Sequence, residues 1–162
     1  MDKLIVVFSD SHRSSFNMSE VMKRYPGAEC VIHLGDGEDD TSYLSLGPET
    51  GLLTVRGNCD IMSDAPEIYR VNLCGIDMIM CHGHAFGVKY DVSRYEAYAA
   101  SQNCDIALFG HTHTPYKNVV RNGEKTVTVF NPGSISRPTT GKPTYGLIKI
   151  GDDGFDITCL TV

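Results

Sequence analysis

The sequence predicts an α/β protein in which two sheets pack face to face with helices on the outside. Three observations lead to this prediction. The chain has 162 residues, of which 41% are hydrophobic and 21% charged, the balance of an ordinary globular domain. Strand and helix patterns alternate in the first part of the chain, whereas the last part is almost entirely strand-like and antiparallel in pattern. Two packed sheets covered by helices satisfy both patterns.

The first part of the chain alternates apolar strands with helix signals. The apolar run Leu4–Phe8 is typical of a strand buried on both faces. A helix is expected next, because Asn17 and Glu20 have the spacing of a capping box and Pro26-Gly27 would end the helix. The elements expected after it are a strand at Cys30–Leu34, a short helix within Thr41–Leu46 and a strand at Leu52–Val55.

The second part begins with a predicted hairpin around Gly75, followed by one helix. Asp91 is expected to cap that helix, which runs to about Gln102. The predicted strands of this part are Ile68–Leu73, Ile76–Cys81, Asp105–Phe109, Tyr116–Arg121, Lys125–Phe130, Tyr145–Ile150 and Phe155–Leu160. No linker or repeat interrupts the pattern, so residues 1–162 are predicted to form one domain.

Composition excludes several classes of protein. The net charge of −6 argues against a dedicated nucleic-acid binder. No apolar run approaches the ~18–20 residues of a membrane span, and no signal-peptide pattern is visible, so we expect a cytoplasmic protein without membrane contact. None of the six cysteines forms a C-x-x-C pair, and free, mostly buried thiols are expected.

Five predicted strands end in short segments of Asp, His and Asn, with glycine nearby. The segments are Ser9–His12, Gly35–Asp36, Arg56–Asp60, His82–His84 and Gly110–His113. Ligands of open α/β sheets gather where such strand ends converge. Five of the six histidines lie in these segments, and His33, inside a strand, is interpreted as structural. Residues i and i+2 of an extended segment point to the same side, so each Asp-x-His or His-x-His pair can offer two ligands to one point.

Seven side chains are candidate metal ligands, more than one tetrahedral zinc can use. They are Asp10, His12, Asp36, Asn58, His82, His111 and His113. Seven ligands predict two divalent ions, which a carboxylate can bridge through its two oxygens. Asp36 is the candidate bridge. Two such ions and two aspartates leave positive charge for a hydroxide and a phosphodiester anion, which favours phosphoryl transfer.

Taken in order, the motifs resemble those of the calcineurin-like metallophosphoesterase superfamily, in particular its small prokaryotic phosphodiesterases. The residues that carry the resemblance are Asp10-x-His12, Gly35-Asp36, Arg56-Gly57-Asn58-Cys59-Asp60, His82-Gly83-His84, Gly110-His111-Thr112-His113 and Asn131-Pro132-Gly133-Ser134. The resemblance implies a four-layer α/β/β/α sandwich of two mixed sheets with helices outside. It also implies structural support of the site by the segment that begins at Asn131.

The resemblance further implies a metal-dependent phosphodiesterase that hydrolyses small phosphodiesters by attack of a metal-bridging hydroxide. One ion would be held by Asp10, His12, Asp36 and His113, and the other by Asp36, Asn58, His82 and His111. Manganese is the first choice of metal, and the same ligands also suit iron, nickel, cobalt or zinc. His84 remains an alternative to His82 as a ligand.

Cys59 departs from the family pattern, because many members have a catalytic histidine at this position. A thiol has a higher pKa than imidazole and is a weak hydrogen-bond donor, so we expect a slow enzyme that prefers leaving groups of low pKa. Asn58, Asp60 and His84 are the catalytic candidates, and Asn58 and Cys59 are expected to contact substrate. Asp60 either orients a neighbour or caps a turn, and His84 is a substitute proton donor.

Two alternative functions remain open. One is a non-catalytic protein-binding scaffold of the same fold, as in the vacuolar sorting subunit of the retromer. The presence of all seven candidate ligands favours an enzyme over this alternative. The other is a phosphomonoesterase or nucleotide pyrophosphatase, which shares the metal core. The expected partner is a small phosphodiester substrate, and a homodimer is the working hypothesis for the oligomeric state.

Overall fold

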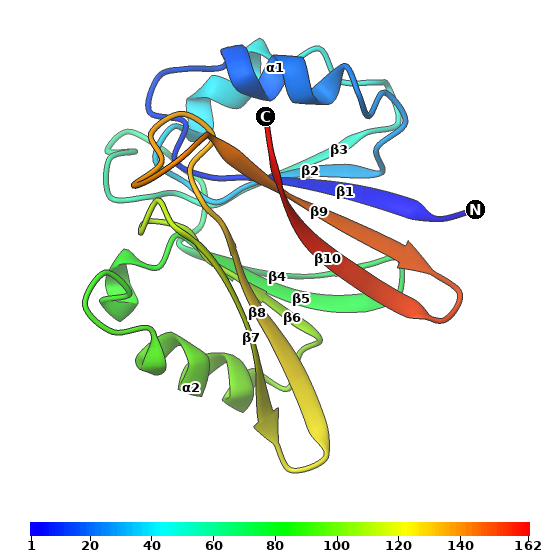
Figure 1. Ribbon diagram of the computed structural model, residues 1–162, viewed down its shortest axis with the longest axis vertical. Coiled ribbons are helices and arrows are strands. Elements are labelled where there is room, and N and C mark those ends of the chain that lie inside the picture. Colours follow the sequence, from blue (N-terminus) through cyan, green and yellow to red (C-terminus); the bar gives the residue numbers. More distant parts are fainter.

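The computed structural model describes residues 1–162 and contains two five-stranded mixed sheets (Figure 1). The first sheet has the order β10 (Gly154–Thr161), β9 (Thr144–Gly151), β1 (Lys3–Phe8), β2 (Cys30–His33), β3 (Gly51–Thr54). The second has the order β4 (Ile68–Leu73), β5 (Ile76–Cys81), β6 (Ile106–Leu108), β8 (Lys125–Pro132), β7 (Pro115–Asn122). Three adjacent strands of each sheet are parallel, β1–β2–β3 and β5–β6–β8, and the others are antiparallel. The predicted mixed sheets are confirmed.

The alternating side chains of the buried strands hold the layers together. In β1, Ile5 and Val7 face the second sheet and join one core with Met78 and Met80 of β5. Each such side chain stabilises the fold by about 1.5–3 kcal/mol through burial. Truncating Met80 to alanine would therefore cost about 2–5 kcal/mol.

One α-helix covers the outer face of each sheet (Figure 1). Helix α1 (Phe16–Met22) packs Met18 and Val21 against the outward side chains of β1, and α2 (Ser93–Gln102) packs Tyr95 and Ala99 against the second sheet. Two short 3-10 helices, η1 (Glu38–Tyr43) and η2 (His84–Phe86), lie in loops. No helix is both long enough and apolar enough to cross a membrane.

Three local predictions about helices have different outcomes. Asp91 was expected to cap α2, but the N-cap is Val92; Asp91 lies one residue earlier and accepts a hydrogen bond from the Ser93 amide at 2.9 Å. The capping box at Asn17 is wrong: α1 already begins at Phe16, and the Asn17 amide group instead donates to the carbonyl of Ile135 at 2.9 Å. The helix expected within Thr41–Leu46 is the earlier 3-10 helix η1.

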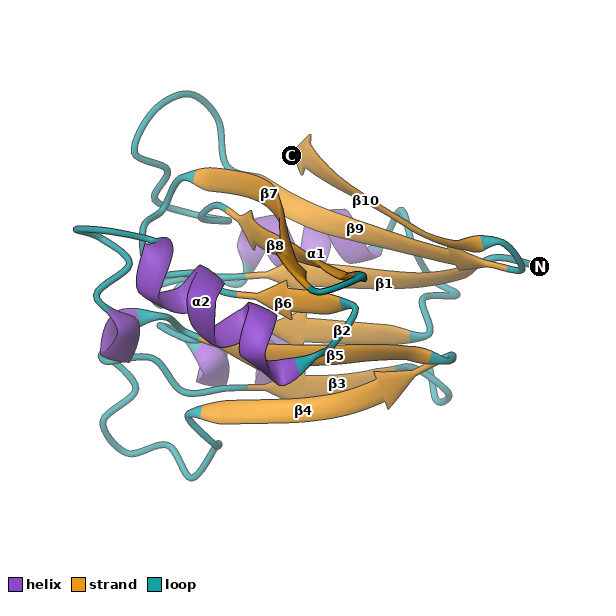
Figure 2. Ribbon diagram, turned by 90° about the horizontal axis from the view of Figure 1, so that it is seen from below, coloured by secondary structure: helices purple, strands orange, loops and turns teal.

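The parallel strands direct their following loops to the same end of the molecule. Figure 2 shows the long loops gathered at one end of both sheets, on the left, whereas tight turns lie at the other end. The backbone pairing of β1 with β2 continues into these loops, because Asp10 N–H donates to the carbonyl of Gly35 and His12 N–H to that of Asp36, both at 3.0 Å. The polar segments after β1 and β2 are thereby joined, and those after β3, β5 and β6 lie at the same end of the sheets (Figure 2).

Candidate metal centre

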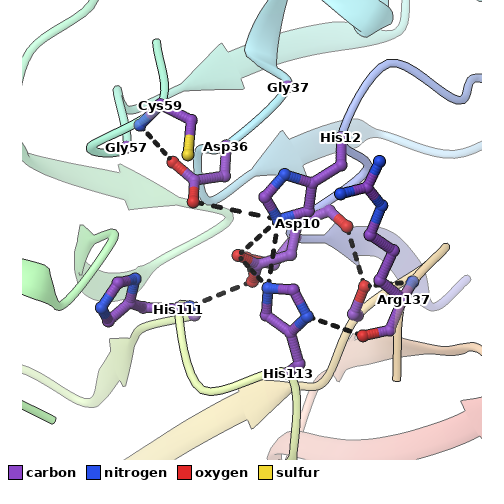
Figure 3. A network of polar contacts seen from close by, with 12 residues as sticks. Asp10, His12, Asp36, Gly37, Gly57, Cys59, His111, His113 and Arg137 are labelled. Carbon is purple, nitrogen blue, oxygen red and sulfur yellow. Dashed lines mark hydrogen bonds and ion pairs between the residues drawn. The ribbon is translucent and has the colours of Figure 1, made fainter. Parts of the chain in front are cut away.

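Six of the seven predicted ligands form two clusters in these loops (Figure 3 shows five of the six). One cluster contains Asp10, His12 and His113, and the other contains Asp36, His82 and His111; within each, the ligand atoms lie within 4.8 Å of one another. The two imidazole nitrogens are 3.1 Å apart in the first cluster and 3.0 Å apart in the second. Two nitrogens that each lie about 2.1 Å from a shared ion are separated by about 3.0–3.4 Å, so both pairs fit one ion each.

The carboxylates connect the two clusters. Asp36 Oδ2 lies 3.9 Å from His12 Nε2 and 3.2 Å from His82 Nε2. Asp10 Oδ1 lies 3.3 Å from His113 Nε2 and 3.8 Å from His82 Nε2. The other oxygen of Asp36 accepts a hydrogen bond from the Cys59 amide at 2.8 Å. A bridge through Asp36 would therefore use one oxygen, and not two as the sequence argument assumed.

Asp10 provides the clearest sign that a cation belongs here. Its Oδ2 accepts hydrogen bonds from the Ser9 hydroxyl at 2.6 Å and from the His111 amide at 3.0 Å. Its Oδ1 is fully buried and has no hydrogen-bond partner. A buried carboxylate oxygen without a partner costs about 1–3 kcal/mol or more, which a bound divalent ion would offset. The donor set present therefore fits divalent metal ions.

Backbone carbonyls orient two of the histidines. His82 Nδ1 lies 2.7 Å from the carbonyl of Leu34, and His113 Nδ1 lies 2.6 Å from the carbonyl of Arg137. A carbonyl only accepts, so each Nδ1 carries a hydrogen, and the neutral ring presents the lone pair of its Nε2 to a cluster. Such outer contacts are typical of metal-binding histidines.

Five of the six clustered residues have a left-handed backbone. Their φ values lie between 46° and 70°: Asp10, His12, Asp36, His111 and His113. This conformation costs an L-residue about 1–2 kcal/mol, and Asp, Asn and His tolerate it best among side chains other than glycine. Strained positions of this kind cluster at functional sites.

The clustered side chains shift one another's pKa values. Burial alone would raise the pKa of Asp10 and Asp36, but contacts with His113 and His82 hold both below the usual range. The same contacts raise the pKa of His82 and His113 above 6.5, although burial opposes this. Burial and the charge of His82 lower the pKa of His111 to about 4. Both carboxylates are thus ionised at neutral pH and attract cations.

The predicted catalytic residues lie around the clusters in different ways. Cys59 Sγ lies within 4.8 Å of the ligand atoms of His12 and Asp36, and burial together with Asp36 raises the pKa of its thiol. Asn58 is exposed, and its amide group contacts Cys59 Sγ at 3.5 Å. His84 lies outside both clusters, with its ring 5.5 Å from that of His82 and a buried Nδ1 without a partner. His82 is therefore the clustered residue of the pair.

Asp60 has a positioning role in the structure. Its carboxylate accepts hydrogen bonds from the amides of Asp36, Gly37 and Gly57 at 2.7–2.8 Å, and from that of Glu38 at 3.4 Å. These contacts bind the loop after β3 to the loop that carries Asp36. Both roles considered for Asp60 are visible: it caps the turn from Gly57 to Asp60, and it orients the backbone of Asp36.

The sequence interpretation missed a buried polar network behind the first cluster. The Ser11 hydroxyl lies 2.6 Å from Asp40 Oδ2 and 2.9 Å from His33 Nε2. His33 Nδ1 accepts the Gly35 amide at 3.1 Å, so its Nε2 carries the hydrogen that is donated to Ser11. Asp40 had no distinguishing signal, because it lies in a polar run that resembles an ordinary loop.

The segment that begins at Asn131 supports the site, as the resemblance implies. The Asn131 amide group donates to Gly110 O and Thr112 Oγ1, both at 3.0 Å. The Ser134 hydroxyl donates to the carbonyl of Asp10 at 2.8 Å. The loops that carry ligands from both sheets are thus held by one buried segment.

Comparison with known proteins agrees with this geometry. Residues 4–153 match the model of the calcineurin-like phosphoesterase superfamily domain. A phosphodiesterase of Escherichia coli, YfcE, is 34% identical over 171 aligned residues, which cover 86% of this chain and 84% of that protein. The crystal structure of a conserved protein of Streptococcus pneumoniae, described as a predicted phosphoesterase, has a TM-score of 0.78 and 32% identity over 99% of this chain and 90% of that one.

A more distant protein has the same fold. Vps29 of Entamoeba histolytica in complex with Zn²⁺ has a TM-score of 0.71 and 22% identity, covering 98% of each chain. At this identity the likeness concerns the fold alone. The family model, the two closer relatives and the paired Asp/His clusters together show that the chain belongs to the calcineurin-like phosphoesterase superfamily.

Proposed function

We propose that this protein is a metal-dependent phosphodiesterase that hydrolyses small phosphodiesters with two divalent ions. The observation that carries the proposal is the pair of adjoining clusters with Asp36 Oδ2 and Asp10 Oδ1 between them. Asp10, His12, Asp36 and His113 would hold one ion, and Asp36, Asn58, His82 and His111 the other. Manganese remains the first choice of metal, and the E. coli relative named as a phosphodiesterase supports the choice of reaction.

The residues of the site prepare it for this chemistry. Bound divalent ions would supply an activated water at neutral pH and neutralise charge on the phosphate group. Asp10 and Asp36 are ionised, and the carbonyls behind His82 and His113 fix the lone pairs of both rings. Asn58 is exposed, its amide group contacts Cys59 Sγ, and it would contact a phosphate oxygen of the substrate.

The proposed enzyme lacks a strong general acid to protonate the leaving group. Cys59 has a raised thiol pKa, so it is a poor acid near pH 7. Burial and the charge of His82 lower the pKa of His84, which is therefore neutral at pH 7; its N–H can donate a hydrogen bond to the leaving group, but the ring is a poor source of a proton. We expect phenolates to leave much faster than alkoxides.

The test is hydrolysis of bis-p-nitrophenyl phosphate by chelator-treated protein with and without Mn²⁺, with p-nitrophenyl phosphate as the monoester comparison. Asp36→Ala should abolish the metal-dependent rate. Asp153→Ala, an exposed aspartate in the turn between β9 and β10, is the matched control and should retain it. Faster hydrolysis of the monoester would favour a phosphomonoesterase. No hydrolysis with Mn, Fe, Co, Ni or Zn would favour the scaffold function.

A further inference from the structure

A cavity of about 640 Å³ opens directly beside the first cluster. Its lining includes His12 and Asp36 of the two clusters, and it is formed by the loops after β1, β2, β3 and β8. A phosphate held between the clusters would have this cavity next to it. One of the two ester arms of a diester would therefore extend into it.

Two arginines on separate loops line this cavity. Arg13 follows His12 directly, and the carbonyl of Arg137 holds His113, so both arginines flank the first cluster. Figure 3 shows the Arg137 side chain beside the His12 ring. Both residues are exposed, and neither guanidinium has a carboxylate or hydrogen-bond partner in the structure. By contrast, Arg56 and Arg70 are paired with Glu67 and Asp77.

Most of the acidic residues that line the cavity are already engaged. Asp40 accepts hydrogen bonds from the Ser11 hydroxyl and the Arg13 amide. Asp60 accepts four backbone amides, and Asp36 belongs to the metal centre. Asp39 alone is exposed and without a side-chain partner. The neutral donors leave the charge of Asp40 and Asp60 in place but fix both carboxylates in the wall. Among the side chains that are free to contact a ligand, two guanidinium groups thus face the single carboxylate of Asp39.

The remaining wall is apolar. Ile61 and Met62 line the cavity and are 84% and 92% exposed, so they contribute little to the core of the protein itself. An aromatic ring or other apolar body can pack on them. Guanidinium groups bind phosphate and carboxylate oxygens in a bidentate manner.

We propose that this cavity is a specificity subsite in which Arg13 and Arg137 bind a second anionic group, a phosphate or a carboxylate, on one ester arm of the substrate. Ile61 and Met62 would contact the apolar body of the same arm. The substrate class is then a phosphodiester with an additional charged oxyacid group. This proposal rests on the proposed phosphodiesterase function.

The test compares three p-nitrophenyl aryl phosphodiesters with a common leaving group. The second aryl arm carries no substituent, a para-carboxylate or a para-phosphonate. For the Mn²⁺-loaded protein, we expect kcat/KM to be higher for an anionic arm than for the neutral arm. This preference should fall about tenfold for each of Arg13→Gln and Arg137→Gln, mainly through KM. The comparison of carboxylate with phosphonate identifies the preferred group.

Two matched variants control for general charge effects. Arg24→Gln removes an exposed arginine remote from the cavity and should leave the preference unchanged. Asp39→Asn removes the free carboxylate and should increase the preference. Equal kcat/KM for all three diesters in the unmodified protein, or the same loss of preference in Arg24→Gln, would overturn the subsite.

A binding measurement separates failure of the subsite from failure of the proposed function. Phenylphosphonate is titrated into metal-free protein and followed by NMR. Shifts confined to the loops of Arg13, Ile61 and Arg137, and lost in the double variant Arg13→Gln/Arg137→Gln, would support the subsite even if no diester is hydrolysed. Hydrolysis of the neutral diester without preference or binding would overturn the subsite and leave the phosphodiesterase function standing.

Discussion

At the scale of single residues, the loop at Gly57 lies so close to Asp36 that no side chain fits at position 57. A Cβ atom on Gly57 would lie 2.1 Å from Asp36 Oδ1 and 2.5 Å from the Asp36 nitrogen. The second distance is to backbone, so the loop that carries Asp36 would have to move. A displacement of this loop would move Asp36 Oδ2, the carboxylate oxygen that lies between the two clusters.

Gly57→Ala should therefore impair the metal centre more than the fold. We expect at least tenfold weaker Mn²⁺ binding, measured by titration calorimetry, and a stability loss of about 1–3 kcal/mol. Gly27→Ala is the matched control, because a Cβ there meets no atom within 4 Å. Equal Mn²⁺ affinity of the two variants would contradict this account.

The thiol of Cys59 leads to a second prediction about a single residue. Cys59→His should raise kcat for a diester with an alkoxide leaving group by about tenfold or more, since general acid catalysis is typically worth 10²–10⁴-fold. The rate for a p-nitrophenolate leaving group should change much less. Cys59→Ser is the control, and a similar gain in both variants would disprove acid assistance as the cause.

At the scale of elements, the network around Ser11 joins the loops that follow β1 and β2. Ser11 is fully buried and contacts both His33 and Asp40. Burial lowers the pKa of His33 to about 4, so this histidine is neutral and its single N–H is directed to Ser11. Without the hydroxyl, the imidazole and the carboxylate would each lose a buried partner.

Ser11→Ala should destabilise the protein by about 1–3 kcal/mol, the cost of leaving buried polar groups unpaired. Urea denaturation of metal-free protein measures this loss without a contribution from bound ions. Ser42→Ala removes an exposed hydroxyl that donates only to a nearby carbonyl, and should change stability by less than about 0.5 kcal/mol. A Ser11 variant as stable as the Ser42 variant would show that the network contributes nothing.

The sequence predicted those elements whose pattern is local. The strands were predictable because runs such as Leu4–Phe8 are apolar, and the ligands because Asp and His recur directly after such strands. The capping box at Asn17 failed because α1 already begins at Phe16, so Asn17 lies within the first turn, where its amide group donates to the distant Ile135 carbonyl. The carbonyl of Arg137 that orients His113 could not be predicted, since a backbone group leaves no trace in residue type.

At the scale of the whole molecule, the ion pair of Asp105 with Lys125 joins strands of the second sheet at the end opposite the candidate site. Asp105 accepts hydrogen bonds from Lys125 and from the Asp77 amide. Burial alone would raise the pKa of Asp105, but these contacts outweigh it and lower the pKa below 3.8. The ionised carboxylate therefore stabilises the fold above the unfolded pKa, and this contribution is lost as the pH falls through the lower folded value.

Asp105→Asn should reduce stability at pH 7 by up to about 1 kcal/mol, the range for partly exposed pairs. The difference from the unmodified protein should shrink between about pH 5 and pH 3. Thermal melts of metal-free protein across this range measure it, with Asp153→Asn as the exposed control. A difference that grows as the pH falls would have the wrong sign for this explanation.

The clustered ligands are divided equally between the two sheets. Asp10, His12 and Asp36 follow strands of the first sheet, whereas His82, His111 and His113 follow strands of the second. Because each cluster contains ligands from both sheets, a bound ion would crosslink the two sheets. Its release requires that ligands from both sheets dissociate from it. The rate at which a chelator removes the metal is thus expected to report how often the sheets separate. Core variants such as Met80→Ala should then accelerate metal loss although they lie outside the site.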